Sequence, residues 1–102
     1  MTAAAVTTRI YPHTTVIALR GDIDQAETDH LRHALVGTLM RRRPRRIVVD
    51  LTRATTLDPT AIGALRAAQD SARDLDIALD VRRPSHAMTA ALTRHGFAVS
   101  AA

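Results

Sequence analysis

The stretch Asp50–Leu65, DLTRATTLDPTAIGAL, contains the end of one structural element and the start of the next. The mostly apolar run Ile47–Leu51 leads into it and is typical of a central strand that is covered on both faces. Asp58 is a good helix N-cap because its carboxylate accepts free amide protons, and Pro59 suits the first helical position. Thr60 then lies in the first turn. The stretch predicts a strand followed by a helix, with a hydroxyl at the helix start.

Four further segments have the composition of strands. Thr15–Arg20, TVIALR, is rich in β-branched residues, and Arg9–Tyr11 predicts a shorter strand before it. Leu75–Arg82 alternates between apolar and polar residues, which indicates a strand with one buried face. Phe97–Val99 predicts a short edge strand at the end of the chain.

Caps and apolar periodicity predict two more helices. Asp24 is a plausible N-cap, with Glu27 at the spacing of a capping box. Ser85 is the next cap, and Gly96 stands where a glycine commonly ends a helix. The apolar positions expected on the inner faces of the three helices are Ala26, Leu31, Ala34, Leu35 and Leu39, then Ala61, Ile62, Leu65, Ala68 and Ala72, then Ala87, Met88, Ala91 and Leu92.

The predicted order is β-β-α-β-α-β-α-β, which indicates a small α/β protein with right-handed crossovers and a mixed sheet. The 102 residues suit one domain, so we expect residues 1–102 to form a single unit. Tyr11 and Phe97 are the only aromatic residues, and the core must therefore be aliphatic.

The composition excludes several classes of protein. There is no cysteine, which removes disulfides, thiolate catalysis and cysteine zinc sites. The N-terminal sequence does not resemble a secretory signal, and no run is long enough to cross a membrane. We therefore expect a cytoplasmic protein without membrane insertion.

The net charge is +4, and every basic side chain is an arginine. Arg41–Arg46, RRRPRR, is the densest cluster and could contact nucleic acid phosphates. It is one short loop without interleaved aromatic residues, which favours a solvated loop with no direct nucleic acid contact. A secondary role in attracting acidic partners is the alternative.

Histidines and carboxylates offer little support for a metal site or an enzyme. His30 and His33 lie three residues apart on one predicted helix, but no third ligand accompanies them convincingly. Asp24 and Asp58 are explained as caps, and no nucleophile, base and orienting group occur together. We expect no catalytic residue, no metal and no cofactor. On capping rules alone, Thr60 is most simply an ordinary helix-start residue.

Three segments resemble STAS domains, the family that includes bacterial anti-sigma factor antagonists. IVVDLTRATTLDPTAIGAL (47–65) is similar to the family's strand followed by Asp-Ser-Ser-Gly-Leu-Gly at a helix start. GDIDQAETDHLRHAL (21–35) resembles its earlier Gly-x-Leu/Ile-Asp segment, and TRHGF (93–97) resembles its late turn. The resemblance covers nearly the whole chain with the elements in the same order.

The resemblance carries site residues with it. Asp58 matches the family's aspartate, Pro59 takes the place of the first serine, and Thr60 matches the phosphoacceptor. Ala61 replaces the usual glycine, whereas Gly63 keeps the second one. The implied partner-binding surface combines this helix start with the segment Gly21–Gln25, and its residues are Gly21, Asp22, Asp24, Asp58, Pro59, Thr60, Ala61 and Gly63.

The resemblance also implies a mode of action. An unphosphorylated antagonist binds an anti-sigma factor, often a protein kinase of the histidine-kinase-like ATPase type, and phosphorylation at the position of Thr60 ends the complex. ATP then belongs to the partner, and the protein itself is a monomer or weak dimer. STAS domains also serve as cytoplasmic subunits of lipid-transport ABC systems and as scaffold components of stress complexes, and both roles stay open as alternatives.

Overall fold

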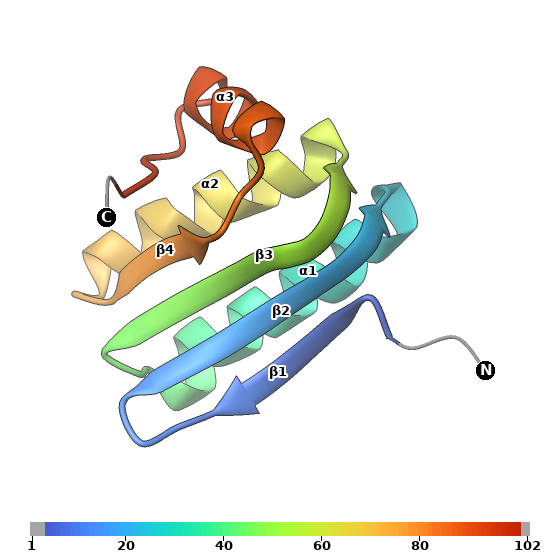
Figure 1. Cartoon of the computed structure of the whole chain (residues 1–102). Helices are drawn as coiled ribbons and strands as arrows, with labels where there is room; N and C mark the ends of the chain where they lie inside the picture. The colour runs from blue at the N-terminus through green and yellow to red at the C-terminus, as the bar shows by residue number, and fades with distance from the viewer. Residues whose placement is uncertain (1–3, 101–102) are drawn as a thin grey trace.

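The computed structural model describes residues 4–100, which form one mixed sheet and three α-helices (Figure 1). The elements are β1 (Val6–Ile10), β2 (Thr14–Ile23), α1 (Gln25–Gly37), the π-helical turn η1 (Thr38–Arg42), β3 (Arg46–Leu57), α2 (Pro59–Asp74), β4 (Ala78–Arg82) and α3 (His86–Arg94). The strand order is β1-β2-β3-β4, with β1 antiparallel to β2 and the other pairs parallel. The predicted fold class is confirmed.

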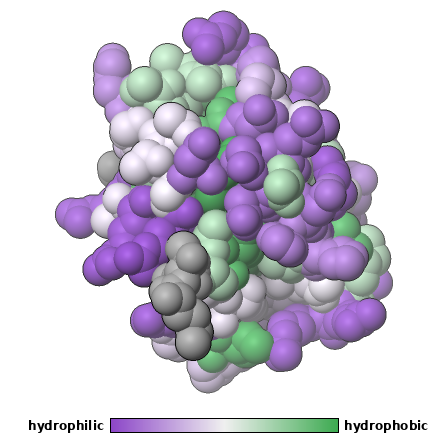
Figure 2. Space-filling view, turned by 90° about the vertical axis from the view of Figure 1, so that its right-hand side faces the viewer, coloured by the Kyte–Doolittle hydropathy of each residue, from purple (hydrophilic) through white to green (hydrophobic). Residues whose placement is uncertain are grey.

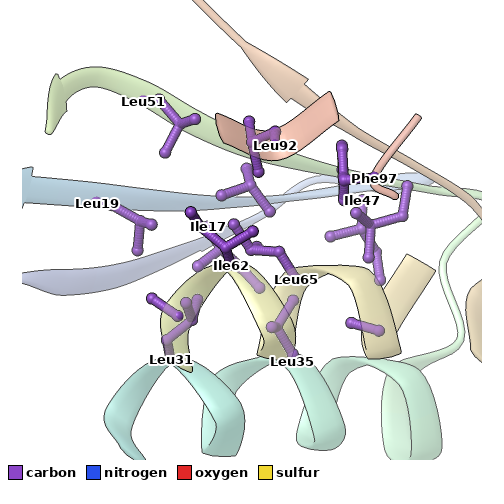
Figure 3. Close-up of a cluster of buried hydrophobic side chains, with 14 of the residues drawn as sticks. Ile17, Leu19, Leu31, Leu35, Ile47, Leu51, Ile62, Leu65, Leu92 and Phe97 are labelled. Atoms are coloured by element: carbon purple, nitrogen blue, oxygen red, sulfur yellow. The ribbon is translucent and has the colours of Figure 1, made fainter. Parts of the chain in front are cut away.

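The core lies between the sheet and the two helices behind it, α1 and α2 (Figure 1). Alternate residues of β2 and β3, such as Ile17 and Leu51, point toward Leu65 of α2 and Leu31 of α1 (Figure 3). Apolar area removed from water stabilises a domain by about 25 cal/mol per Å², so this aliphatic layer provides most of the driving force for folding. Leu92 and Phe97 complete the same cluster from α3 and the segment after it.

The expectation that both faces of the central strand are covered is wrong. β3 is an interior strand, but α1 and α2 lie on the same side of the sheet (Figure 1). Val16 and Val48 face the other side, where neighbouring side chains bury them without a covering helix. Within Ile47–Leu51 the residues on this open side are Val48 and Asp50. A buried Val48 shielded by neighbours reads like a valine under a helix, and the carboxylate of Asp50 was the available signal of an open face.

On the side of the molecule where β2 and β3 end, hydrophobic surface lies between hydrophilic flanks (Figure 2). Ala5, Val6 and Ala34 line a groove between α1 and the edge strand β1. A short edge strand with a partly apolar groove beside it leaves this side of the sheet open to solvent.

Several predicted boundaries change in the structure. β1 spans Val6–Ile10 in place of Arg9–Tyr11, and β3 continues past Leu51 to Leu57. β2 continues through Gly21 to Ile23, so the expected Gly21–Gln25 loop is strand up to Ile23 and helix from Gln25. Pairing with β3 extends the strand, through two register shifts and a positive φ of 76° at Gly21. Helix α2 runs to Asp74, so Leu75–Ile77 is a helix end and turn that precedes β4.

The last predicted strand, Phe97–Val99, does not form. The buried amide of Gln69 instead holds this segment beside α2. Its Oε1 accepts from the Ala98 amide at 2.9 Å, and its Nε2 donates to the carbonyls of Ala98 at 2.9 Å and Leu79 at 3.2 Å. One side chain thus satisfies the backbone groups that a strand partner would otherwise satisfy.

The predicted helix ends are confirmed, with small differences in burial. Asp24, Asp58 and Ser85 each accept a first-turn amide proton, and Gly96 follows α3 with a φ of +87°. Of the predicted inner positions, Ala26 and Ala87 are exposed, because Thr28 and Met88 take the inward-facing positions in the first turns of these helices.

Candidate functional site

Two helix starts meet at one edge of the sheet, where the parallel strands β2 and β3 end side by side. Ile23 pairs with Leu57 at the last register position, and the Asp58 amide donates to the Ile23 carbonyl at 2.9 Å. Asp24 follows β2 and caps α1, whereas Asp58 follows β3 and caps α2. The topology therefore brings together two caps that are far apart in the chain.

The Asp58 carboxylate orients the first turn of α2. Its Oδ2 accepts from the Thr60 amide at 2.9 Å and from the Thr60 hydroxyl at 2.5 Å. These two donors hold the pKa of Asp58 below its ordinary value, because they stabilise the charged form. Pro59 occupies the first helical position without losing a hydrogen bond. Thr60 is exposed, with its hydroxyl fixed against the cap.

A second threonine, which the sequence analysis did not single out, contacts Thr60 from α1. The Thr28 and Thr60 hydroxyl oxygens lie 3.2 Å apart, and the Thr28 hydroxyl also lies 2.9 Å from the Asp24 carbonyl, to which it donates. Thr28 is only 1% exposed. It occupies the inner face of α1 with Leu31 and Leu35, and a polar residue at an apolar position was the available signal.

The remaining predicted residues fall into two groups. Asp22 lies at the end of β2, where the Thr56 hydroxyl of β3 donates to its carboxylate, and Gly63 presents an open surface on α2. Ala61, in contrast, is fully buried in the core cluster, so its side chain faces away from the surface. The structure thus brings Asp24, Asp58 and Thr60 together, and it turns Ala61 inward.

Four acidic residues lie at this end of the sheet, and one of them, Asp58, contacts Thr60. Asp22, Asp24 and Asp58 lie at the ends of β2 and β3, and Glu27 is in the first turn of α1. The amides of both helix starts supply partial positive charge that these carboxylates offset. The edge therefore offers hydrogen-bonding groups and negative charge to a partner.

The other candidates lie elsewhere. His30 contacts Glu27 at 3.1 Å, and within residues 4–100 no three histidine, aspartate or glutamate side chains group as metal ligands. Arg41–Arg46 lies at the start of β3, the end opposite Thr60, and its arginines are exposed. No helix in the described part of the chain is long and apolar enough to span a membrane.

Solved structures share this architecture at low sequence identity. The anti-sigma factor antagonist SpoIIAA in its unphosphorylated form superposes with a TM-score of 0.80 at 17% identity, over 96% of this chain and 89% of that one. The phosphorylated form of SpoIIAA from Bacillus gives 0.78 at 17% identity, over 90% and 84%. A sulfate transporter family protein from Wolinella succinogenes gives 0.71 at 21% identity, over 87% and 71%. These likenesses establish the fold.

Comparison at the level of sequence families is more specific. No curated protein matches the chain significantly. A family model described as "Mlab, STAS domain" matches residues 6–99, which include every strand, every helix and both helix starts of the site. The chain therefore belongs to the STAS domain family.

Proposed function

We propose that this protein is an anti-sigma factor antagonist that works by binding and not by catalysis. The exposed hydroxyl of Thr60, held by Asp58 on one side and by Thr28 on the other, is the observation that carries the proposal. The partner-binding surface combines Gly21, Asp22 and Asp24 with the first turns of α2, from Asp58 to Gly63. Ala61 contributes to it as core support beneath the turn, and not as a contact.

Phosphorylation of Thr60 is the switch in this proposal. A phosphate adds between one and a half and two negative charges at pH 7. It would replace the proton that Thr60 donates to Asp58, and it would stand beside a carboxylate that is already ionised. The fold does not need that proton, because the Thr60 amide still donates to Asp58. The surface changes its charge while the domain stays folded.

The partner in this proposal is an anti-sigma factor of the kinase type, which supplies ATP and transfers its γ-phosphoryl group to the Thr60 oxygen. Burial of Thr60 in the complex makes the added charge costly, since both the charge and the neighbouring carboxylate must lose water. A loss on the order of a hundredfold in affinity is expected. The structural likeness to SpoIIAA, solved with and without phosphate, supports this choice.

The decisive experiment mixes the purified chain with candidate anti-sigma factors from its own cell and measures binding before and after addition of ATP. Mass spectrometry of the tryptic peptide Ala54–Arg66, ATTLDPTAIGALR, then locates any phosphate. Phosphate on Thr60 together with weaker binding supports the proposal. Phosphate on Thr55 or Thr56 alone, or tight binding that ATP leaves unchanged, contradicts the switch.

A cytoplasmic subunit of a lipid-transport ABC system is the second candidate function. The likeness to a sulfate transporter family protein favours a transporter association, and Pro59 stiffens the segment that a kinase would have to reach. In that role the same first turn docks without regulated phosphorylation. Co-purification with an ATP-binding cassette subunit, and an unmodified Ala54–Arg66 peptide across growth conditions, would support it.

A further inference from the structure

The sheet face opposite α1 and α2 is a second surface that the proposed function does not use. Across this face the register places Arg9 beside Val16, and Val16 beside Val48. Thr7 and Ala18 form the next pair. Figure 1 shows this face toward the viewer, with no helix over β1, β2 or β3.

The open sheet face contains a shallow hollow. Three arginines at its border have no acidic partner among the described residues. Arg9, Arg20 and Arg53 all line it and are exposed. Within residues 4–100 none of the three forms an ion pair. Two carboxylates lie on this face. Asp50 lies 3.8 Å from Arg82 and accepts from the Thr52 hydroxyl, and Asp80, the register partner of Val48, accepts from the backbone amides of Val81 and Ser100. The face therefore carries positive charge that the chain itself does not balance.

Two of these arginines are also neighbours. Arg20 and Arg53 are register partners on β2 and β3, so two guanidinium groups start from adjacent backbone positions. Like charges on neighbouring strands reduce stability, and neither side chain compensates by burial. Such a local conflict is typical of a position that serves binding and not folding.

We propose that this open face binds an acidic amphipathic segment of a partner protein. Its carboxylates pair with Arg9, Arg20 and Arg53, and its apolar side chains pack on Ala18 and on the exposed ring of Tyr11. Bidentate pairing of a guanidinium with a carboxylate gives both direction and strength to such contacts. An anion between Arg20 and Arg53 also relieves their mutual repulsion. This surface is separate from the first turn of α2, so two partners can be bound by one molecule.

A polypeptide fits the face better than a nucleic acid does. Asp50 stands next to Ala18 in the register, within the hollow. A phosphate chain carries a charge at every repeat and cannot avoid this carboxylate, whereas a polypeptide can place acidic residues against the arginines alone. Single-stranded nucleic acids also need aromatic platforms, and Tyr11 is the one aromatic residue that lines the hollow.

The test uses NMR titration of the ¹⁵N-labelled chain with three probes. They are an amphipathic peptide of about five helical turns with a glutamate face and a leucine face, the same peptide with lysine in place of glutamate, and an oligothymidylate of similar length. Saturable shifts at Thr7, Arg9, Val16 and Ala18 with the glutamate peptide alone support the proposal. No saturation by that peptide, or tighter binding of the oligothymidylate at these amides, overturns it.

Charge-reversed variants distinguish binding at this face from non-specific electrostatic attraction. Arg53→Glu should weaken the affinity for the glutamate peptide on the order of tenfold. It should also raise the melting temperature, because the introduced carboxylate would pair with Arg20. The matched control is Arg42→Glu in the distant arginine loop, which should leave the affinity unchanged. Equal losses in both variants would overturn the proposal. Thr60→Glu should bind the peptide like the wild type, so the outcome does not depend on the proposed switch.

Discussion

The hydroxyl of Thr28 on α1 lies 3.2 Å from the hydroxyl of Thr60 on α2. Thr28 also approaches the Asp24 carbonyl, and Thr60 approaches the Asp58 carboxylate. Each hydroxyl has one proton to donate. The acceptors within reach are the Asp24 carbonyl, the Asp58 carboxylate and the oxygen of the other hydroxyl, so a change at one threonine redistributes hydrogen bonds at the other. The first turns of both helices are thereby coupled through side chains, beyond their contact through the core.

Thr28→Val should weaken partner binding with little change in stability. Valine keeps the shape, and the Asp24 carbonyl retains the Thr28 backbone amide at 3.0 Å. The free energy of unfolding should fall by about 1 kcal/mol or less, whereas Thr60 loses a contact that fixes its rotamer. Urea unfolding and calorimetric binding to the proposed anti-sigma factor partner measure both effects.

The control for this change is Thr38→Val. Thr38 is also buried, and its hydroxyl donates to the Ala34 carbonyl at 2.7 Å, but it lies at the start of η1, away from the site. It should match Thr28→Val in stability and leave binding intact. If both variants bind alike, the Thr28 hydroxyl has no role in recognition.

Thr60→Glu should reduce partner affinity on the order of a hundredfold, since a charge at this position must be desolvated in the complex. The far-UV circular dichroism spectrum and the melting temperature should stay nearly unchanged, because the Thr60 side chain is exposed. Thr55→Glu places the same charge on an exposed position of β3 and should bind normally. Undiminished affinity in Thr60→Glu would count against the switch.

Asp24→Ala should lower both stability and partner binding. The Asp24 carboxylate accepts from the Glu27 amide at 2.9 Å, and loss of such a cap costs about 1 kcal/mol. Ser85→Ala removes the equivalent bond to the Met88 amide of α3 and should cost a similar amount without affecting binding. Thermal unfolding and calorimetry on both variants distinguish a cap from a contact.

Gln69→Leu should destabilise the fold by about 2 kcal/mol. It keeps roughly the same volume but leaves the backbone of Ala98 and the carbonyl of Leu79 without the hydrogen bonds that Gln69 provides. Hydrogen exchange at the Ala98 amide should accelerate more than exchange in β3. Unchanged protection at Ala98 would show that burial of Phe97 alone holds this segment.

Acid should remove the contribution of Asp58 to stability. Its folded pKa lies below the ordinary value of 3.8, because the Thr60 hydroxyl and amide donate to the carboxylate. The stabilisation is therefore complete above the unfolded pKa and declines as the pH falls through the folded pKa. Asn is also a good N-cap, so Asp58→Asn should fold and lose less stability than the wild type below pH 3.8. An NMR titration midpoint of Asp58 at or above that value would refute the assignment.

The features that the sequence predicted are those that depend on neighbours in the chain. Asp58 caps α2 because of the residues that directly follow it, and Gly96 ends α3 for a similarly local reason. The STAS assignment, too, came from short segments in a fixed order. The aliphatic core at Leu31, Leu65 and Leu92 followed from helical spacing.

The features that escaped prediction depend on residues far apart in the chain. Gly21–Ile23 became strand because β3 continues beside it, and Phe97–Val99 lost its predicted strand because Gln69 reaches it from α2. Thr28 meets Thr60 through the packing of α1 on α2, which no spacing within either helix encodes. Which face of the sheet stays uncovered likewise depends on the side on which α1 and α2 pack.

The arginine loop and the carboxylates of the helix starts lie at opposite ends of β3, which gives the molecule a permanent charge dipole along that strand. Near a larger charged molecule or surface, this charge distribution should orient the protein before contact. Near an anionic surface, Arg41–Arg46 would face that surface. The Thr60 edge would then point to the solution, accessible to a second protein. The rate of association with such an anionic surface should therefore fall with rising salt concentration more steeply than the rate of dissociation rises.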